Sequence, residues 1–346
     1  MNKKHFSWLL VLTVVVAAVI LLMPGPTGQE SMFEVEPLLP GLKEEVNEID
    51  RVRIVAAGNQ EVISMVRTDD AWVEETHSYP ADWSRLKTLL AELAQAQVIE
   101  LKTRNPEYFG RLGLSGVDSS DSKAVLVELE GGNSPYRILV GNTAQEREGH
   151  YLRLADSDQA VLIDRTLVVP RQPSEWLESE IIDIAADEVV EATITHRDGE
   201  VVSIRKVSAD DEDFSLQQVP EGREAQSAWV VNALGGMLSN LNLQQVVPVD
   251  EVDWSEAVNL RVLTADGVEV QARLASVDGG NWLRLEALPY QGIAENGVSR
   301  AVADDTMERV DTINRRVAGW AYSLTDNQAL QMKKRMDDLL KAESES

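Results

Sequence analysis

Apolar and polar positions divide the chain into an uncharged leading segment, a mixed body and a tail. No residue from Phe6 to Met23 carries a charge. A helix of this length rises roughly 27 Å, close to the roughly 30 Å thickness of a hydrocarbon core. Lys3 and Lys4 precede the segment and would hold the amino terminus in the cytoplasm. The pattern predicts a transmembrane anchor over Phe6–Met23, a cytoplasmic stub at residues 1–5 and a body outside the cytoplasm.

A cleaved signal peptide is the competing interpretation of this segment. Signal peptides have an apolar core of about 7–15 residues and a cleavage site of small residues. The segment here is longer, and the "MPGPTGQE" that follows offers no such site. The sequence therefore favours an uncleaved anchor in a bacterial inner membrane, with the rest of the protein in the periplasm. Residues 24–46 are rich in proline and acidic residues and are predicted to form an extended linker.

The body begins with a pattern typical of three strands and a helix. In "DRVRIVAAGNQEVISMVRTDDAWVEE", two runs rich in Val and Ile flank a Gly-Asn turn, and a third run surrounds Trp72. From Asp82 to Gln97, apolar residues recur at helical spacing, and Asp82 is suited to the N-cap. A strand-like "VIEL" follows.

A second region repeats this order of patterns. Between Glu188 and Val207, two β-rich runs flank "RDGE", and a third run follows around Phe214. A helical pattern then extends through residues 226–247, although Gly235 and Gly236 weaken it and would also permit close approach to a neighbouring strand. The clearest extra segment of the first region is "NPEYFGRLGLSGVDSSD", at residues 105–121.

Both regions end in the same phrase, "GHYLRL" at 149–154 and "GNWLRL" at 280–285. The alternation of apolar and polar residues predicts a half-buried strand. Arg153 and Arg284 lie between two leucines and should point to the opposite face. A duplicated structural strand explains the phrase; a ligand or an acidic partner shared by the two arginines is the alternative.

These patterns predict an α+β protein in which a transmembrane helix precedes two similar β-rich units. Each unit is expected to pack one main amphipathic helix on antiparallel strands. Apolar residues at helical spacing in residues 304–322, and again after Thr325 or Asp326, predict helices in the tail. The expected boundaries are 47–185 for the first unit, 186–298 for the second and 299–346 for the C-terminal helices.

Charge and composition exclude several classes of function. The chain has 58 acidic and 32 basic residues, a net charge of −26, which disfavours nucleic acid as a ligand. It has no cysteine, so disulfides, thiolate metal sites and a cysteine nucleophile are excluded. Its four histidines are scattered, which disfavours a zinc site.

Reactive motifs are equally scarce. The sequence has no P-loop, no GxGxxG after a strand, no HExxH and no GxSxG. The acidic loops at residues 210–213 and at Asp118 and Asp121 lack the spacing of a calcium loop and are interpreted as solvated. We therefore predict no catalytic, cofactor-binding or metal-ligating residue, although two carboxylates distant in sequence could still meet in the fold.

Tryptophans supply the remaining candidates for binding. Trp72, Trp83, Trp229 and Trp282 occupy apolar-periodic positions and are expected in the core. Trp176 and Trp254 lie in polar loops and are expected at the surface. The predicted contact residues for a partner or ligand are therefore Arg153, Arg284, Trp176 and Trp254.

Several phrases together resemble one bacterial family. They are "PLLPGLKEEVNEIDRVRI", "DWSRLKTLLAELAQAQVIELKTRNPEYFGRLGL", "ILVGN", "GHYLRL" and the tail "INRRVAGWAYSLTDNQALQMKKRMDDLL". With the single span before them, they resemble the domain of unknown function 4340 family over nearly the whole chain. Members are often encoded beside an ABC transporter of the gliding-motility type. The resemblance supplies no catalytic residue.

The resemblance implies an accessory subunit of an ABC-type transport or envelope complex, without catalysis of its own. Its expected partners are the inner membrane, through Phe6–Met23, and the transporter's permease or auxiliary subunit, while ATP hydrolysis would come from another chain. One alternative is a periplasmic ligand-binding or sensing domain with a pocket between the two units. The other is an envelope hydrolase that uses carboxylates.

Overall fold

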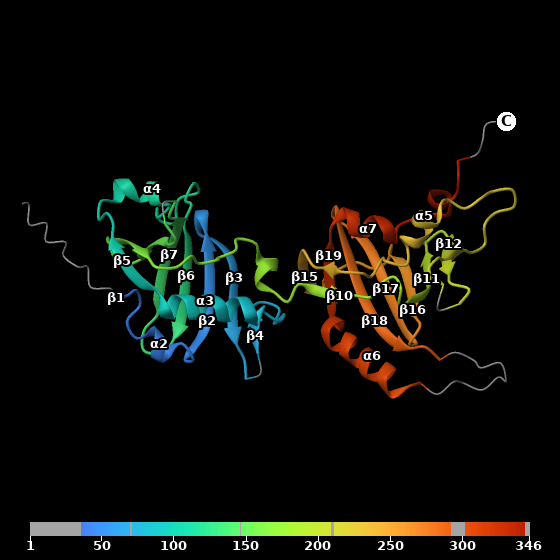
Figure 1. Cartoon of the computed structure of the whole chain (residues 1–346), viewed down its shortest axis with the longest axis horizontal. Helices are drawn as coiled ribbons and strands as arrows, with labels where there is room; N and C mark the ends of the chain where they lie inside the picture. Colours follow the sequence, from blue (N-terminus) through green and yellow to red (C-terminus); the bar gives the residue numbers. More distant parts are fainter. Residues whose placement is uncertain (1–35, 70, 146, 209–210, 292–301, 343–346) are drawn as a thin grey trace, which may run out of the picture.

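Two large antiparallel sheets, each in a lobe of its own, form the body of the protein (Figure 1). The computed structural model describes residues 36–69, 71–145, 147–208, 211–291 and 302–342. The first sheet has nine strands and the second has eight. A ribbon of two short strands, β10 (Glu180–Ile182) and β14 (Leu241–Asn242), accompanies them.

The first sheet has the strand order β1-β5-β9-β8-β7-β6-β2-β3-β4. Its strands are β1 (Glu36–Pro37), β2 (Ile49–Ala56), β3 (Gln60–Arg67), β4 (Trp72–Glu74), β5 (Gln97–Leu101), β6 (Val125–Gly131), β7 (Tyr136–Thr143), β8 (His150–Leu154) and β9 (Ala160–Ile163). Its helices are α2 (Leu42–Glu45), α3 (Trp83–Gln95) and α4 (Phe109–Leu112).

Helix α3 forms where the sequence predicts it and covers one face of the first sheet (Figure 1). The Asp82 side chain accepts a hydrogen bond from the Arg85 backbone amide at 3.0 Å, as an N-cap does. Four leucines of α3 are buried against the strands, namely Leu86, Leu89, Leu90 and Leu93. The helical spacing of these leucines is what attaches α3 to the sheet.

The second sheet has the strand order β13-β12-β11-β16-β17-β18-β19-β15. Its strands are β11 (Val189–Thr195), β12 (Val201–Arg205), β13 (Ser215–Leu216), β15 (Gln245–Pro248), β16 (Val258–Thr264), β17 (Val268–Val277), β18 (Gly280–Pro289) and β19 (Trp320–Leu324). Its helices are α5 (Ala228–Asn232), α6 (Asp304–Val317) and α7 (Asp326–Met332).

Eight strands follow each other in the same way in both sheets. The order β5-β9-β8-β7-β6-β2-β3-β4 of the first sheet corresponds to β15-β19-β18-β17-β16-β11-β12-β13 of the second. The strands also succeed each other along the chain in the same sequence, except that α6 intervenes between β18 and β19. The phrases "HYLRL" and "NWLRL" lie in β8 and β18, which take the same place in the two orders.

The predicted α+β fold class is wrong, although the antiparallel strands that it included are present. The structure is mostly β, with large antiparallel sheets. The helical pattern of residues 226–247 forms only the short α5, followed by turns. The segment predicted as C-terminal helices contains β19 as well as α6 and α7. Helix α6 ends at Val317, and Gly319, whose φ is 86°, then turns the chain into strand β19.

The predicted fold class also included a transmembrane helix, which the described part of the structure does not contain. Among the described residues, no helix has the length and apolar character that crossing a membrane requires. The predicted span Phe6–Met23 lies outside the described residues.

Aromatic side chains join the two lobes. The ring of Tyr79, from the first lobe, meets Trp320 and Tyr322 of β19 edge to face, with centroids 5.0 and 6.3 Å apart. Its hydroxyl donates to the Glu178 carbonyl at 2.9 Å. Burial raises the pKa of Tyr79 to about 12, so this hydroxyl remains a donor. Buried side chains of both sheets belong to one continuous apolar cluster.

Candidate functional site

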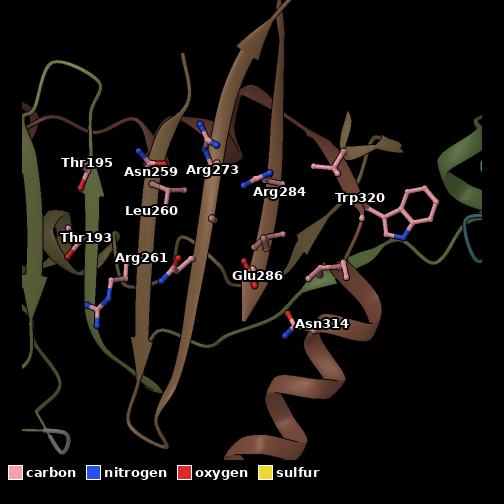
Figure 2. Close-up of a pocket in the computed structure, with 17 residues that line it drawn as sticks. Thr193, Thr195, Asn259, Leu260, Arg261, Arg273, Arg284, Glu286, Asn314 and Trp320 are labelled. Atoms are coloured by element: carbon pink, nitrogen blue, oxygen red, sulfur yellow. The ribbon is translucent and has the colours of Figure 1, made fainter. Parts of the chain in front are cut away.

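A hollow of about 670 Å³ lies on one face of the second sheet (Figure 2). Strands β11, β16, β17 and β18 form its floor, and the end of α6 with Trp320 forms one wall. Side chains alternate along a strand, so residues between the buried core positions point into the hollow. The strands therefore contribute polar side chains to the hollow, and apolar residues of the strands and of the wall complete its lining.

Register places these polar side chains in two rows across the sheet. The first row is Thr195, Asn259, Arg273 and Arg284. The second row is Thr193, Arg261, Gln271 and Glu286.

Arg261, in the second row, has its charge neutralised within the sheet. It donates to Glu191 at 2.6 Å and to Glu269 at 2.8 Å. Partial burial acts to lower the pKa of Arg261, but the hydrogen bonds and charges of Glu269 and Glu191 outweigh it and raise that pKa. Arg261 is thus part of a salt-bridge network and is not available to bind an anion.

Arg273 and Arg284 lack such partners. They lie directly opposite each other on β17 and β18. Arg273 donates to the Trp254 carbonyl at 2.6 Å, and its buried Nε has no hydrogen-bond partner. Arg284 lies over the Trp254 ring, 5.6 Å from its centroid. In the described part of the chain neither forms an ion pair with a carboxylate, so two like charges face each other across a strand pair.

The corresponding row of the first sheet is apolar except for its arginine. Two neighbouring rows align the sheets: Ile54, Val127, Ile138 and Leu154 in the first, and Ile194, Leu260, Ala272 and Leu285 in the second, each residue pairing with the next in its row. One position further along, the row that matches Thr195, Asn259, Arg273 and Arg284 consists of Val55, Leu126, Leu139 and Arg153.

A segment of the chain covers this apolar row in the first sheet. Val55, Leu126 and Leu139 are buried in a cluster with Phe109 and Leu114, which belong to the connection 102–124 between β5 and β6. That connection contains the extra segment, residues 105–121, seen in the sequence.

The arginine of the covered row has a structural role. Arg153 lies 4.6 Å from the Phe109 ring centroid and donates to the Ser157 carbonyl at 2.9 Å. Its longer contacts, at 3.4 Å, are to the carbonyls of Leu154 and Ala155.

The corresponding connection in the second lobe is much shorter. It comprises residues 249–257, between β15 and β16. Val252, Ala257 and Trp254 of this connection pack with Ala275 and Ala321 and so cover only one end of the sheet face. The hollow occupies the part that residues 249–257 leave open.

The other predicted contact residues differ in their placement. Trp176 is fully buried, and its indole nitrogen donates to the Pro170 carbonyl at 3.0 Å, so its predicted surface position is wrong. Trp254 is half-buried beneath Arg284, and its indole nitrogen donates to the Val249 carbonyl at 2.8 Å. The structure thus brings two of the four predicted residues together, Arg284 and Trp254.

Two tryptophans expected in the core are instead exposed. Trp83, although it stacks on Trp72 with centroids 6.4 Å apart, is 48% exposed, and Trp229 is 79% exposed. Both tryptophans lie a turn or less before the first buried residue of their helices. At that position the spacing of apolar residues does not distinguish a buried side chain from one at the exposed edge of the apolar face. Arg273 was missed because only the pairing of β17 with β18 places it beside Arg284.

The hollow has the composition of a binding surface. Glu286 is its one carboxylate among the described residues that line it, so the paired carboxylates of a glycosidase are not found there. No group of three His, Cys, Asp or Glu side chains in the described ranges is placed to hold a metal ion. Guanidinium, amide and hydroxyl groups make the hollow rich in hydrogen-bond donors.

Comparison with known proteins identifies one family. The family described as "Domain of unknown function (DUF4340)" matches residues 72–261. The chain belongs to the DUF4340 family. The DUF4340 match includes Arg153, Trp176 and Trp254 and ends at Arg261, before Arg273 and Arg284. No curated protein and no solved structure matches the chain.

Proposed function

We propose that this DUF4340 protein is a non-catalytic binding subunit of an envelope complex of the ABC-transporter type. The open face of the second sheet would be its contact surface for the permease or the auxiliary subunit. The observation that carries the proposal is the contrast between two equivalent rows. One is apolar except for Arg153 and is covered by residues 102–124, whereas the other is polar and is covered by residues 249–257 at one end only.

The same strand order in both sheets supports a duplicated origin for this surface. In an ancestral unit with an apolar sheet face, that face would need a cover, because an apolar face exposed to water is unfavourable. The second lobe does not need this cover, because polar residues replace the apolar ones: Thr195, Asn259 and Arg273 stand where the first lobe has Val55, Leu126 and Leu139. The second copy could therefore lose its cover and offer the face to another molecule.

The envelope location is part of the proposal and rests on the amino terminus of the sequence. The apolar residues 6–23 behind Lys3 and Lys4 would target the chain to the inner membrane and leave the body in the periplasm. An alkaline phosphatase reporter fused after Ser346 should be active in the periplasm. Activity of a cytoplasmic reporter at the same position would contradict this location.

A small-molecule sensor is the second candidate function, favoured by the size of the hollow. About 670 Å³ lies within the range of about 300–1,000 Å³ typical of ligand pockets. Such pockets are mostly apolar and enclosed, whereas polar and apolar residues share the lining of this one about equally, on an open sheet face. These features favour a protein partner.

Photo-crosslinking in intact membranes tests the proposed surface. A photoreactive amino acid at Gln271, on the floor of the hollow, should crosslink the full-length chain to a permease or auxiliary subunit of an ABC transporter. The matched control is Lys87, an exposed position on α3 of the first lobe, which should give no such product. Equal crosslinking from both positions, or none from Gln271, would reject the surface.

A further inference from the structure

We infer that Arg273 and Arg284 form a carboxylate-binding site for an aspartate or glutamate side chain of the partner protein. This inference rests on the proposed function and adds the chemistry of recognition to it. The two residues are cross-strand neighbours, and Figure 2 shows them side by side on the floor of the hollow.

The arrangement is incomplete without an anion. Like charges directly opposite each other on paired strands are unfavourable, and no carboxylate of the described chain neutralises these two. Glu286, two residues after Arg284 on the same face, forms no ion pair with it. In a chain of net charge −26, two facing arginines without a carboxylate partner are best explained by an anion from outside.

Trp254 holds both arginines in place. Its carbonyl accepts from one terminal nitrogen of Arg273, and its ring lies beneath the Arg284 guanidinium. The carbonyl occupies only one N–H group of Arg273, and the ring occupies only one face of the Arg284 guanidinium. Each guanidinium has five N–H donors in all. The remaining donors are therefore restrained in direction before any ligand arrives, which lowers the entropy lost on binding.

A carboxylate fits these donors and this surface better than a larger polyanion does. Guanidinium groups bind carboxylates through two parallel hydrogen bonds, and Asn259 beside Arg273 adds an amide donor. Nucleic acid and anionic membranes would have to approach an acidic protein over a wide area. Among the described residues that line the hollow, a single acidic side chain meets two arginines without an ion pair, Arg273 and Arg284, against one carboxylate, Glu286, and salt screens charges beyond roughly 8 Å.

Peptide binding to the full-length protein in detergent micelles tests the inference. The probes are a fluorescein-labelled octapeptide that alternates glutamate with glycine and the same peptide with glutamine, read by fluorescence anisotropy. We expect the glutamate peptide to bind, the glutamine peptide to bind at least tenfold more weakly, and R273Q or R284Q to weaken glutamate-peptide binding at least fivefold. R315Q, an exposed arginine hydrogen-bonded to Thr312, is the matched control and should bind as the wild type does.

Several outcomes would overturn the inference. Equal binding of the two peptides, or unchanged binding in both variants, would remove the carboxylate site. Displacement of the peptide by inorganic phosphate at lower concentration than by acetate would assign the arginines to phosphate instead. Circular dichroism establishes that each variant is folded, and R284K, which keeps the charge, should recover only part of the affinity.

The crosslinking experiment separates this inference from the proposed function. If Gln271 crosslinks to the transporter subunit while the glutamate peptide does not bind, the carboxylate site is wrong and the partner surface stands. If the peptide binds and no crosslink forms, the site stands and the proposed partner is wrong.

Discussion

Arg153 and Arg284 occupy equivalent positions in two sheets of the same strand order, and each guanidinium lies over an aromatic ring of the equivalent connection, Phe109 or Trp254. The connection 102–124 also buries the apolar neighbours of Arg153 in its row, whereas Arg284 additionally lines the open hollow. The two arginines therefore differ in how far the rest of their row is covered.

This difference predicts that the same substitution, arginine to glutamine, lowers the free energy of unfolding more at position 153 than at position 284. R153Q should destabilise the protein by about 1–3 kcal/mol, because the backbone carbonyls around Arg153 lose their donor. R284Q should stay within about 1 kcal/mol of the wild type, since a lost cation–π contact is offset by removal of a like-charge pair. Urea unfolding of both variants measures the difference. A larger loss in R284Q would mean that Arg284 is structural.

The cover of the first sheet can be tested at Phe109. Phe109 is buried in the small apolar cluster, so F109A should cost about 3–5 kcal/mol of unfolding free energy. The neighbouring Tyr108 is exposed, and Y108A should cost less than about 1 kcal/mol. Thermal unfolding followed by circular dichroism compares them. Similar stabilities for the two variants would show that residues 102–124 do not hold the sheet face.

Two adjacent glycines provide a test of close packing in the second lobe. A Cβ at Gly235 would come within 2.5 Å of the Phe214 ring, whereas one at Gly236 would meet nothing closer than 3.7 Å. G235A should therefore destabilise the protein by about 1–3 kcal/mol, and G236A should be close to neutral. Denaturant midpoints measure both. Restoration of stability when G235A is combined with F214L would identify the ring as the obstacle.

Local signals in the sequence identified the elements that are governed by local physics. Asp82 caps α3, and Thr325 caps α7 with a capping box. The Gly-Asn and "RDGE" turns join β2 to β3 and β11 to β12. Each of these features depends on residues within one turn of the chain, so the sequence is sufficient to predict them.

The same reasoning failed where an apolar pattern has two solutions. The helical face predicted within residues 226–247 is Trp229, Ala233, Met237, Leu238 and Leu241; the last three are buried, whereas Trp229 is exposed. The buried residues reach the core through the turns and the short strand β14 that follow α5, and Gly235 closely approaches the Phe214 ring where an approach to a strand was expected. Spacing therefore identified part of the buried set, but it did not fix the backbone that buries it.

Part of the candidate site was also beyond local reasoning. The repeated phrase pointed to Arg284, and the polar loop pointed to Trp254. Only strand register, which depends on distant residues, places Arg273 opposite Arg284. Whether a sheet face is covered depends on the lengths of the connections 102–124 and 249–257, and the boundaries of those connections are set by the fold.

Buried His150 predicts a specific dependence of stability on pH. Its Nδ1 accepts from the Leu167 amide at 3.1 Å, so Nε2 carries the proton that is donated to the Gly141 carbonyl at 3.0 Å. Burial lowers the pKa of His150 below its ordinary 6.5, although the Gly141 hydrogen bond opposes the shift. The unfolded chain therefore takes up this proton at a higher pH than the native protein does. The stabilisation by neutral His150 is complete above pH 6.5 and is lost as pH falls through the native pKa.

Comparison of variants isolates this contribution from the many carboxylates that also titrate. H150Q should be less stable than the wild type above pH 7, and the gap in unfolding free energy should narrow steadily as the pH is lowered from 7 to 5. S122A is the matched control, because Ser122 is equally buried and donates to the Ser115 carbonyl without titrating, so its gap should be constant with pH. Urea unfolding at several pH values measures both. If the difference in unfolding free energy between H150Q and the wild type stays constant with pH, His150 does not lose its stabilising contacts on protonation. If that difference widens as the pH falls, the pKa of His150 is raised in the native protein and the proposed direction of the shift is wrong.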